Sequence, residues 1–349
     1  MTPTSKPEKT RVAVIGAGDF GRNHARVYRE LDEAELVGVV DTNAERARAV
    51  AAEFGTQAFV NMEELGGRVD AASVAVPTVH HARVGCRLME MGADVLIEKP
   101  MAATLAQADE LNAQARRCAR VLQVGHLERF NPGLVAAERI VTRPLFFEVH
   151  RLGVFTPRSL DVDVVYDVMI HDLDILLALV KAEVTDVKAV GIPIVTEKVD
   201  IAHARLEFAT GAVANLTASR VSTERVRKLR FFQEHEYVSV DYARRDALRV
   251  RVKASGAAAA APAAMGASYL MGHDSPAPQF GFEKLAVAQE EPLRAELRTF
   301  LAAVRERSVP RVDGEAGRRA LALADRVMAS ILEHAGRVQW GAFPPQAAR

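Results

Sequence analysis

The chain has 349 residues, of which 49% are hydrophobic and 26% are charged, a balance that is typical of globular proteins and excludes a disordered chain. This length exceeds what one ordinary core accommodates, so we expect two domains. Lysine plus arginine and aspartate plus glutamate both number 45, and the resulting formal net charge of zero argues against a dedicated nucleic-acid-binding protein.

Up to residue 125 or so, short apolar runs alternate with helical patterns, as in βαβ units around a parallel sheet. The apolar runs are continuous, which predicts strands that are buried on both faces. The expected elements are strand Arg11–Ile15, helix Asp19–Leu31, strand Leu36–Val40, helix Ala44–Phe54, strand Ala71–Val76, helix Val79–Met91, strand Asp94–Ile97, a helix from the capping residue Thr104 to Cys118, and strand Val121–Val124.

Beyond residue 130 the predicted strands follow one another with short turns, which indicates a mostly antiparallel sheet. The alanine-rich stretch 254–267 predicts a loop on composition alone. The expected elements are strand Leu145–His150, helix Val164–Val180, strands Val187–Ile194, Ala202–Phe208, Ala212–Ser219, Leu229–Gln233 and Tyr237–Tyr242, a helix that begins near Pro292, and helix Glu315–Leu332.

The cysteine content and the chain ends limit the class further. Cys86 and Cys118 belong to no CxxC pair, so the sequence predicts neither a disulfide framework nor a zinc site. The polar segment 1–10 lacks the apolar core of a signal peptide, and no apolar run approaches the ~20 residues that span a bilayer. We therefore expect a cytoplasmic protein with no membrane partner.

A glycine-rich turn follows the first strand and opens the first helix. In such a turn Gly16 permits the tight bend, Gly18 lets the backbone approach a pyrophosphate, and Gly21 lets helix and strand pack closely. Asp41 ends the next strand, where it would bind the adenosine ribose and repel a 2′-phosphate, which favours NAD over NADP. Arg46 lies nearby and weakens this preference. The predicted dinucleotide-binding residues are Gly16, Gly18, Asp19, Phe20, Gly21 and Asp41.

Two further motifs carry groups suited to chemistry. Glu98-Lys99-Pro100 ends the fourth strand, and ligands of parallel sheets bind at the carboxyl ends of the strands, so Lys99 could stabilise negative charge on a substrate oxygen. Asp167 and His171 lie four residues apart on one helix face, so the carboxylate could orient a histidine that serves as general base. A surface lysine, a solvated ion pair or a metal site that includes Asp174 are the alternatives.

Taken in order, the motifs resemble the Gfo/Idh/MocA oxidoreductases. The resemblance covers nearly the whole chain, and it rests on the glycine-rich turn, on Pro77-Thr78-Val79-His80-His81, on Glu98-Lys99-Pro100 and on Asp167-x-x-x-His171. It implies an α/β fold with two domains. A dinucleotide-binding Rossmann domain with a parallel sheet would occupy residues 1–130. An α+β domain with a mostly antiparallel open sheet, for substrate binding and oligomerisation, would occupy residues 131–349.

The resemblance also implies roles for individual residues. His171 would take the proton of a sugar hydroxyl, Lys99 would polarise its oxygen, and Asp167 would assist. Pro77 and Thr78 would line the cofactor, His81 would lie in the helix beside it, and Glu98 would join the same site. Candidates for contact with the substrate are His126, Arg129 and Asp174, and no metal is expected.

A narrower resemblance concerns the branch that includes UDP-N-acetylglucosamine 3-dehydrogenases. It rests on the stretches 125–132, 151–153 and 163–174, and it implies that Arg151 and Arg158 contact a substrate diphosphate. An inositol or free-sugar dehydrogenase of the same family is one alternative, and a non-catalytic dinucleotide-binding regulatory protein is another. The open sheet needs a cover, so a homo-oligomer, either dimer or tetramer, is expected.

Overall fold

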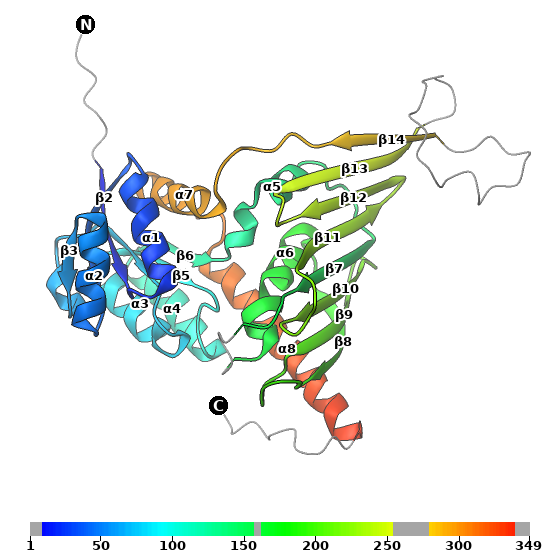
Figure 1. Cartoon of the computed structure of the whole chain (residues 1–349), viewed down its shortest axis with the longest axis horizontal. Coiled ribbons are helices and arrows are strands. Elements are labelled where there is room, and N and C mark those ends of the chain that lie inside the picture. The colour runs from blue at the N-terminus through cyan, green and yellow to red at the C-terminus, as the bar shows by residue number, and fades with distance from the viewer. Residues whose placement is uncertain (1–8, 157–161, 254–278, 339–349) are drawn as a thin grey trace, which may run out of the picture.

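A computed structural model describes residues 9–156, 162–253 and 279–338 of the chain. Arg158 and the alanine-rich stretch 254–267 lie outside the described residues. Figure 1 shows two parts side by side: a parallel sheet flanked by helices, and a larger sheet whose helices lie on one side.

The first part is a six-stranded parallel sheet with the strand order β3-β2-β1-β4-β5-β6. Val12, Val14 and Val95 have no exposed surface, which confirms that the central strands are buried on both faces. The three-residue strand β3 was not predicted, because Gln57 and Ala58 are exposed and leave no apolar run. The elements are β1 (Thr10–Ile15), α1 (Asp19–Glu30), β2 (Ala34–Val40), α2 (Ala44–Phe54), β3 (Gln57–Phe59), β4 (Ala71–Val74), α3 (His81–Glu90), β5 (Asp94–Glu98), α4 (Leu105–Arg117) and β6 (Leu122–Gly125).

Local capping fixes where the helices of this part begin. The Thr104 hydroxyl accepts a hydrogen bond from the Gln107 amide at 3.2 Å, which confirms the predicted cap of α4. Asn43 caps α2 in the same way, with its side-chain oxygen 3.0 Å from the amides of Glu45 and Arg46. Each such cap contributes about 1 kcal/mol to the stability of its helix.

The second part is an eight-stranded sheet with the order β14-β13-β12-β11-β7-β10-β9-β8. Strands β7 and β10 pair in parallel and the other neighbours pair antiparallel, so the prediction of a mostly antiparallel sheet is confirmed. The elements up to the last strand are α5 (Pro132–Glu138), β7 (Phe146–Leu152), α6 (Ile170–Val180), β8 (Val184–Ile192), β9 (Ile201–Phe208), β10 (Val213–Ser219), β11 (Val226–Gln233), β12 (Glu236–Asp241), β13 (Asp246–Lys253) and β14 (Gln279–Lys284).

The sequence reading missed α5, β13 and β14, and it predicted one regular helix over 164–180. The structure instead has a π-helical turn at Val165–Met169 that leads into α6. This wider turn holds Asp167, so the predicted four-residue helical spacing between Asp167 and His171 does not place them as an ideal helix would. A π-helical turn within a helix frequently marks a functional site.

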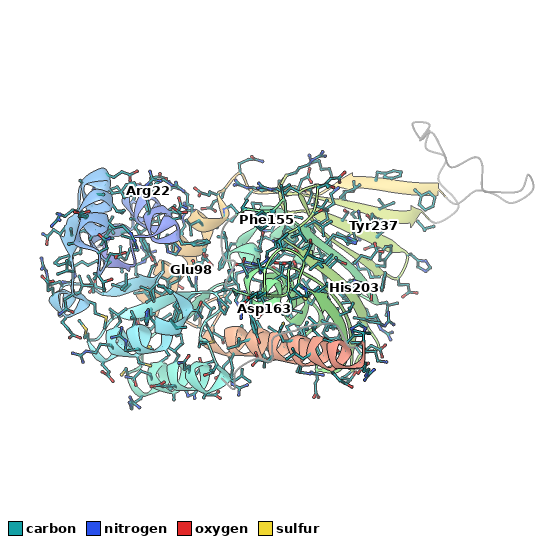
Figure 2. The ribbon with its side chains drawn as sticks, turned by 60° about the horizontal axis from the view of Figure 1, so that its bottom comes forward. Arg22, Glu98, Phe155, Asp163, His203 and Tyr237 are labelled. Atoms are coloured by element: carbon teal, nitrogen blue, oxygen red, sulfur yellow. The ribbon has the colours of Figure 1, made fainter. Side chains whose placement is uncertain are left out.

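One face of the large sheet forms a core and the other faces outward. Helix α5 packs on β12 and β13, α8 (Gly314–Val338) packs on β8, and Phe147 and Phe231 are fully buried on this inner face. Figure 2 shows Glu98, Phe155 and Asp163 between the two parts of the molecule, whereas His203 and Tyr237 lie on the far side of the sheet. The inner face thus looks toward the end of β5.

The last two helices connect the two parts. Helix α7 (Pro292–Glu306) begins with Pro292 in its first turn, as predicted, and its residues Leu297 and Phe300 pack with Val12 and Tyr28 of the first part. The division of the chain at residue 130 stays a prediction, since α7 follows the second sheet in sequence but lies in the core of the first. Among the residues that the structure describes, no helix combines the length and apolar character needed to cross a bilayer.

Candidate active site

The glycine-rich turn between β1 and α1 has the shape of a phosphate cradle. Gly16 has a φ of 101°, and an added Cβ there would clash with the backbone of Ala75, while a Cβ on Gly21 would clash with the carbonyl of Gly16. At Gly18, by contrast, a Cβ would meet no atom within 4 Å, and this N-cap residue makes no side-chain cap. Open space at the start of a helix fits the pyrophosphate of a dinucleotide.

Asp41 lies beside this turn with its carboxylate held in place. One oxygen accepts a hydrogen bond from the Ala17 amide at 2.9 Å, and the other accepts one from the Asn43 amide at 2.8 Å. Arg46 approaches the first of these oxygens at 3.5 Å. Asp19 and Phe20 are exposed at the start of α1, and the ring of Phe20 is free to cover a bound ligand.

The loop after β4 brings Pro77 and Thr78 to the same end of the sheet, in a short 3₁₀ turn before α3. His81 is 1% exposed, and its two ring nitrogens lie 2.9 Å from the carbonyl oxygens of Pro100 and Val76. His81 therefore lies between the two loops, and its contact with the cofactor stays a prediction.

Lys99 follows β5 and reaches across to the second part of the molecule. Its side chain is 10% exposed, and its ammonium group donates hydrogen bonds to the backbone oxygen of Asp167 at 2.6 Å and to Asp167 Oδ1 at 3.1 Å. The sequence reading paired Asp167 with His171. The structure pairs it with Lys99, because the π-helical turn brings the Asp167 backbone and side chain toward the strand end.

His171 and His126 form the other half of this site, with their rings edge to face and 6.1 Å between centroids. Both ring nitrogens of His126 and Nδ1 of His171 lack a hydrogen-bond partner in the part of the chain that the structure describes. Burial, reinforced by the charges of Lys99 and Arg151, holds the pKa of His171 well below its usual range. Its imidazole is therefore neutral at neutral pH, which is the form a general base requires.

Two predicted substrate contacts are occupied by partners within the protein. Arg129 lies 3.3 Å from Asp174, so each neutralises the other. Arg151 is 5% exposed and makes two 2.8 Å hydrogen bonds to Asp172 and one to Glu128. These bonds use three of the five guanidinium N–H donors. Two carboxylates neutralise the charge of the buried Arg151, and its contact with a substrate diphosphate stays a prediction.

A buried polar cluster lies behind Lys99. Nε2 of His24 is 2.9 Å from Glu98 Oε1, and Glu296 of α7 is completely buried. Neither Glu296 carboxyl oxygen has a hydrogen-bond partner among the described residues, and burial together with the nearby Glu98 raises its pKa well above the usual range. Sequence reasoning missed this cluster. The available signal was His24, which follows Gly21 by three residues on α1 and so lies one helical turn from the glycine-rich turn.

Sequence reasoning also missed Glu128 and Asp172, the carboxylates that hold Arg151. Asp172 lies next to His171, and that adjacency was the available signal. In the described residues, no group of three or more histidine, cysteine, aspartate or glutamate side chains is arranged to hold a metal ion.

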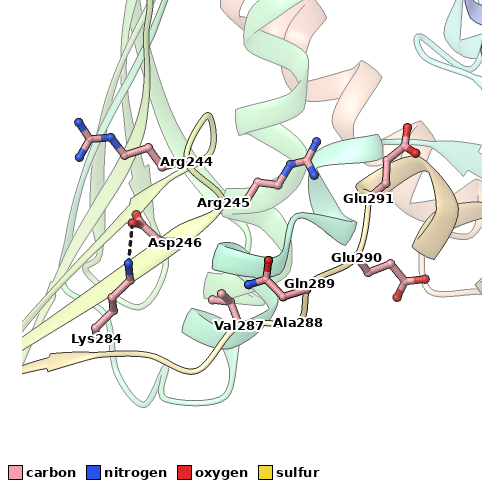
Figure 3. A pocket seen from close by; sticks show the side chains of 9 residues that line it. All are labelled: Arg244, Arg245, Asp246, Lys284, Val287, Ala288, Gln289, Glu290 and Glu291. Carbon is pink, nitrogen blue, oxygen red and sulfur yellow. Dashed lines mark ion pairs between the residues drawn. The ribbon is translucent and has the colours of Figure 1, made fainter.

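A separate hollow of about 460 Å³ lies between the β12–β13 turn and the segment that leads to α7 (Figure 3). Its wall mixes Arg244 and Arg245 with Glu290 and Glu291, and the nearby Lys284 pairs with Asp246 at 3.4 Å. None of the candidate catalytic side chains lines it, so we do not identify it with the site around Lys99 and His171.

The arrangement around Lys99 suits the oxidation of an alcohol. A neutral base and a fixed ammonium group can act on one hydroxyl, because the base removes its proton while the cation stabilises the negative oxygen. The glycine cradle at the ends of the neighbouring strands supplies the place for an electron acceptor.

Two family models match this chain. Residues 10–126 match the model of the oxidoreductase family with an NAD-binding Rossmann fold, and residues 147–238 match the C-terminal domain of GFO/IDH/MocA proteins. UDP-N-acetylglucosamine 3-dehydrogenase of Acidithiobacillus ferrooxidans is 38% identical over 322 residues, which cover 92% of this chain and 97% of that enzyme.

Two further comparisons agree with these. The solved structure of the same Acidithiobacillus ferrooxidans enzyme superposes with a TM-score of 0.81, at 37% identity, over 93% of this chain and 98% of that one. The scyllo-inositol 2-dehydrogenase (NAD(+)) of Bacillus subtilis is 28% identical over 235 residues, which cover 61% of this chain and 68% of that enzyme.

Proposed function

This chain belongs to the Gfo/Idh/MocA oxidoreductase family, and from that premise we propose that it oxidises the 3-hydroxyl of UDP-N-acetylglucosamine to a ketone, with NAD as the electron acceptor. The observation that carries the reaction type is the neutral, partly buried His171 beside the Lys99–Asp167 pair. The substrate is proposed from the relative that matches this chain over nearly its whole length.

In the proposed reaction, His171 accepts the hydroxyl proton of the sugar. Lys99 stabilises the oxygen as negative charge develops on it, and Asp167 holds the ammonium group in position through its backbone and side-chain oxygens. When bound, a nicotinamide ring would supply the redox chemistry as the acceptor of the hydride from the ring carbon. The protein's part is to hold the carbon and the acceptor together.

The dinucleotide would lie on the turn at Gly16, Gly18 and Gly21, with Asp41 toward its adenosine ribose. The preference for NAD is supported by the Asp41 carboxylate, which two backbone amides fix at the edge of the cradle and which would repel a 2′-phosphate.

The test is a substrate panel. The purified protein is mixed with NAD and, in turn, with UDP-sugars, free sugars and inositols, and the reduced cofactor is followed at 340 nm. A second series contains 2-oxoglutarate as a recycling oxidant, which reveals turnover if the cofactor stays bound. Turnover confined to UDP-N-acetylglucosamine or a close relative supports the proposal.

Other outcomes would contradict it. Turnover of a free inositol alone would favour the activity named for the Bacillus subtilis relative and discard the nucleotide-sugar substrate. Tight NAD binding without turnover of any compound would favour a regulatory dinucleotide-binding protein.

We also propose that two copies of the chain pack through the outer face of the large sheet. Phe146, Phe232 and Tyr237 are neighbours across three strands of that face, with ring centroids 5.7 Å and 5.1 Å apart. Val250 of β13 pairs with Tyr237 on one side and with Phe282 of the edge strand β14 on the other, and Phe282 is 65% exposed. Such a row of apolar side chains is costly to leave in water, and a second copy would cover it.

A further inference from the structure

Arg227 lies on the inner face of the large sheet, on the same side of β11 as the buried Leu229 and Phe231, and its charge acts on His171. It stands opposite Arg151 in the register of β11 and β7. Whereas Arg151 is buried, the side chain of Arg227 is exposed to solvent. A molecule that enters from solvent can therefore reach Arg227.

Among the cations around His171, Arg227 has the weakest carboxylate partners, because Glu128 and Asp172 act on it without forming an ion pair. Three permanent cations, Lys99, Arg151 and Arg227, act on this histidine. Lys99 has Asp167 at 3.1 Å, and Arg151 has both Asp172 and Glu128 at 2.8 Å. In the described residues, Arg227 forms no ion pair and no side-chain hydrogen bond, while the neighbouring Arg225 adds further positive charge.

An arginine without a direct ion pair next to a second arginine is a suitable place for an anion to bind. Like charges directly opposite each other on paired strands are destabilising. Partial burial, together with the charge of Arg151, lowers the pKa of Arg227, so the protein environment disfavours this charge. A multivalent anion bound at Arg227 would remove this repulsion and accept several of its N–H groups at once.

We propose that Arg227 binds the diphosphate of the nucleotide-sugar substrate, the role that the sequence analysis predicted for Arg151. The inference rests on the proposed function. It assigns the diphosphate to an arginine other than Arg151, which is paired with Asp172 and Glu128. In a nucleotide sugar the diphosphate is attached at C1, two ring carbons from C3. A cation for it should therefore lie near His171 without contacting the reacting hydroxyl, and Arg227 is within electrostatic reach of His171.

The test compares Arg227→Ala and Arg227→Lys with the unaltered protein and with Arg244→Ala, a control arginine on the β12–β13 turn whose side chain is 79% exposed. Calorimetry measures the Kd of UDP for each protein, and initial rates with NAD give kcat and KM for UDP-N-acetylglucosamine, free N-acetylglucosamine and glucose 6-phosphate. Thermal melting and the Kd of NAD show that each variant is folded.

We expect Arg227→Ala to raise the Kd of UDP and the KM of the UDP-sugar by roughly 10- to 100-fold, with kcat changed less than about threefold, as for the loss of a charge-assisted hydrogen bond. Arg227→Lys should recover part of this loss, and Arg244→Ala should match the unaltered protein. The rate with free N-acetylglucosamine should not change, because that sugar carries no phosphate.

Three results would overturn the proposal. In the first, the UDP-sugar is turned over but Arg227→Ala binds UDP as tightly as the unaltered protein. In the second, the variant loses the UDP-sugar and the free sugar equally, so that Arg227 acts on the sugar or on the fold. In the third, the effect is confined to glucose 6-phosphate, so that the anion is a sugar monophosphate. An unaltered protein that neither binds UDP nor oxidises any UDP-sugar overturns the proposed function itself.

Discussion

The ammonium group of Lys99 is bound to one residue in two ways, 2.6 Å from the backbone oxygen of Asp167 and 3.1 Å from its carboxylate. Lys99 belongs to the end of β5 in the first part of the molecule, and Asp167 belongs to the π-helical turn of the second. This contact therefore sets the position of the cation against the proposed base as well as the position of one part against the other.

Replacing Lys99 by Met should lower kcat at least 100-fold, because the developing charge on the sugar oxygen would lose its nearest cation. Binding of NAD should stay within about twofold of the unaltered protein, since the glycine cradle is not touched. Steady-state rates and NAD titration by fluorescence measure the two effects. Lys188→Met, at a lysine that is 78% exposed on β8, is the matched control. Near-normal turnover by Lys99→Met would remove this residue from the mechanism.

The pH profile should report on His171. Burial, then the charges of Lys99 and Arg151, lower its pKa well below 6.5, so the neutral base persists as pH falls through the range where an ordinary histidine protonates. The acid limb of kcat/KM should therefore lie below pH 6.5. Rates measured from pH 4.5 to 8 at constant ionic strength test this, and a limb above pH 6.5 would contradict it. Removing a neighbouring positive charge, as in Arg227→Ala, should move the limb upward.

Glu296 should make stability depend on pH in the opposite sense to a salt-bridged carboxylate. Its folded-state pKa is raised, so above the unfolded value of 4.5 the unfolded chain releases a proton that the folded protein keeps. Stability contributed by this group is complete below pH 4.5 and falls as pH rises toward the folded pKa, by up to about 1.4 kcal/mol per pH unit. Glu296→Gln removes this titration.

We therefore expect Glu296→Gln to raise the melting temperature clearly at pH 8 and little at pH 5. Scanning calorimetry at both values gives the comparison, and Glu291→Gln, at a partly exposed residue of the segment before α7, is the control. A gain of equal size at both pH values would show that Glu296 is not a buried neutral acid.

The sequence was sufficient for those parts of the site that depend on short stretches of chain. Gly16, Gly18 and Gly21 could be recognised because one tight turn imposes their spacing, and Lys99 because it ends a strand of continuous apolar residues. Thr104 and Pro292 identified their helix starts because a cap requires few residues and no distant partner.

Contacts between distant segments could not be predicted in this way. Nothing in the sequence indicated that Arg151 is paired, because its partners Asp172 and Glu128 lie 21 and 23 residues away and come together only in the folded protein. The π-helical turn that aims Asp167 at Lys99 left no signature in the spacing of apolar residues. Strand β13 was readable from the alternation of Leu248, Val250 and Val252 with arginines, but the adjoining alanine-rich stretch obscured it.

Asp41 should decide between the two dinucleotides. Asp41→Asn keeps an acceptor for the Ala17 amide but removes the negative charge that would repel a 2′-phosphate. The ratio of kcat/KM for NAD to that for NADP should fall by roughly 10- to 100-fold, as expected for the loss of a charged hydrogen-bond acceptor and of that repulsion. Glu45→Gln, at an exposed residue of α2, is the control, and an unchanged ratio would assign cofactor choice to other residues.

The outer face of the large sheet should control assembly. A charge placed at Phe282 or Phe232 would have to be buried if a second copy covers this face, and an unpaired buried charge costs several kcal/mol. Phe282→Glu and Phe232→Glu should therefore convert an oligomer to monomers in light scattering at micromolar concentration. Val309→Glu is the control, because Val309 is 78% exposed on the connection between α7 and α8, away from the sheet. If the sheet variants keep the mass of the unaltered protein, the subunits associate through another surface. If Val309→Glu alone dissociates the oligomer, the interface includes the α7–α8 connection, and the aromatic row then needs a different explanation.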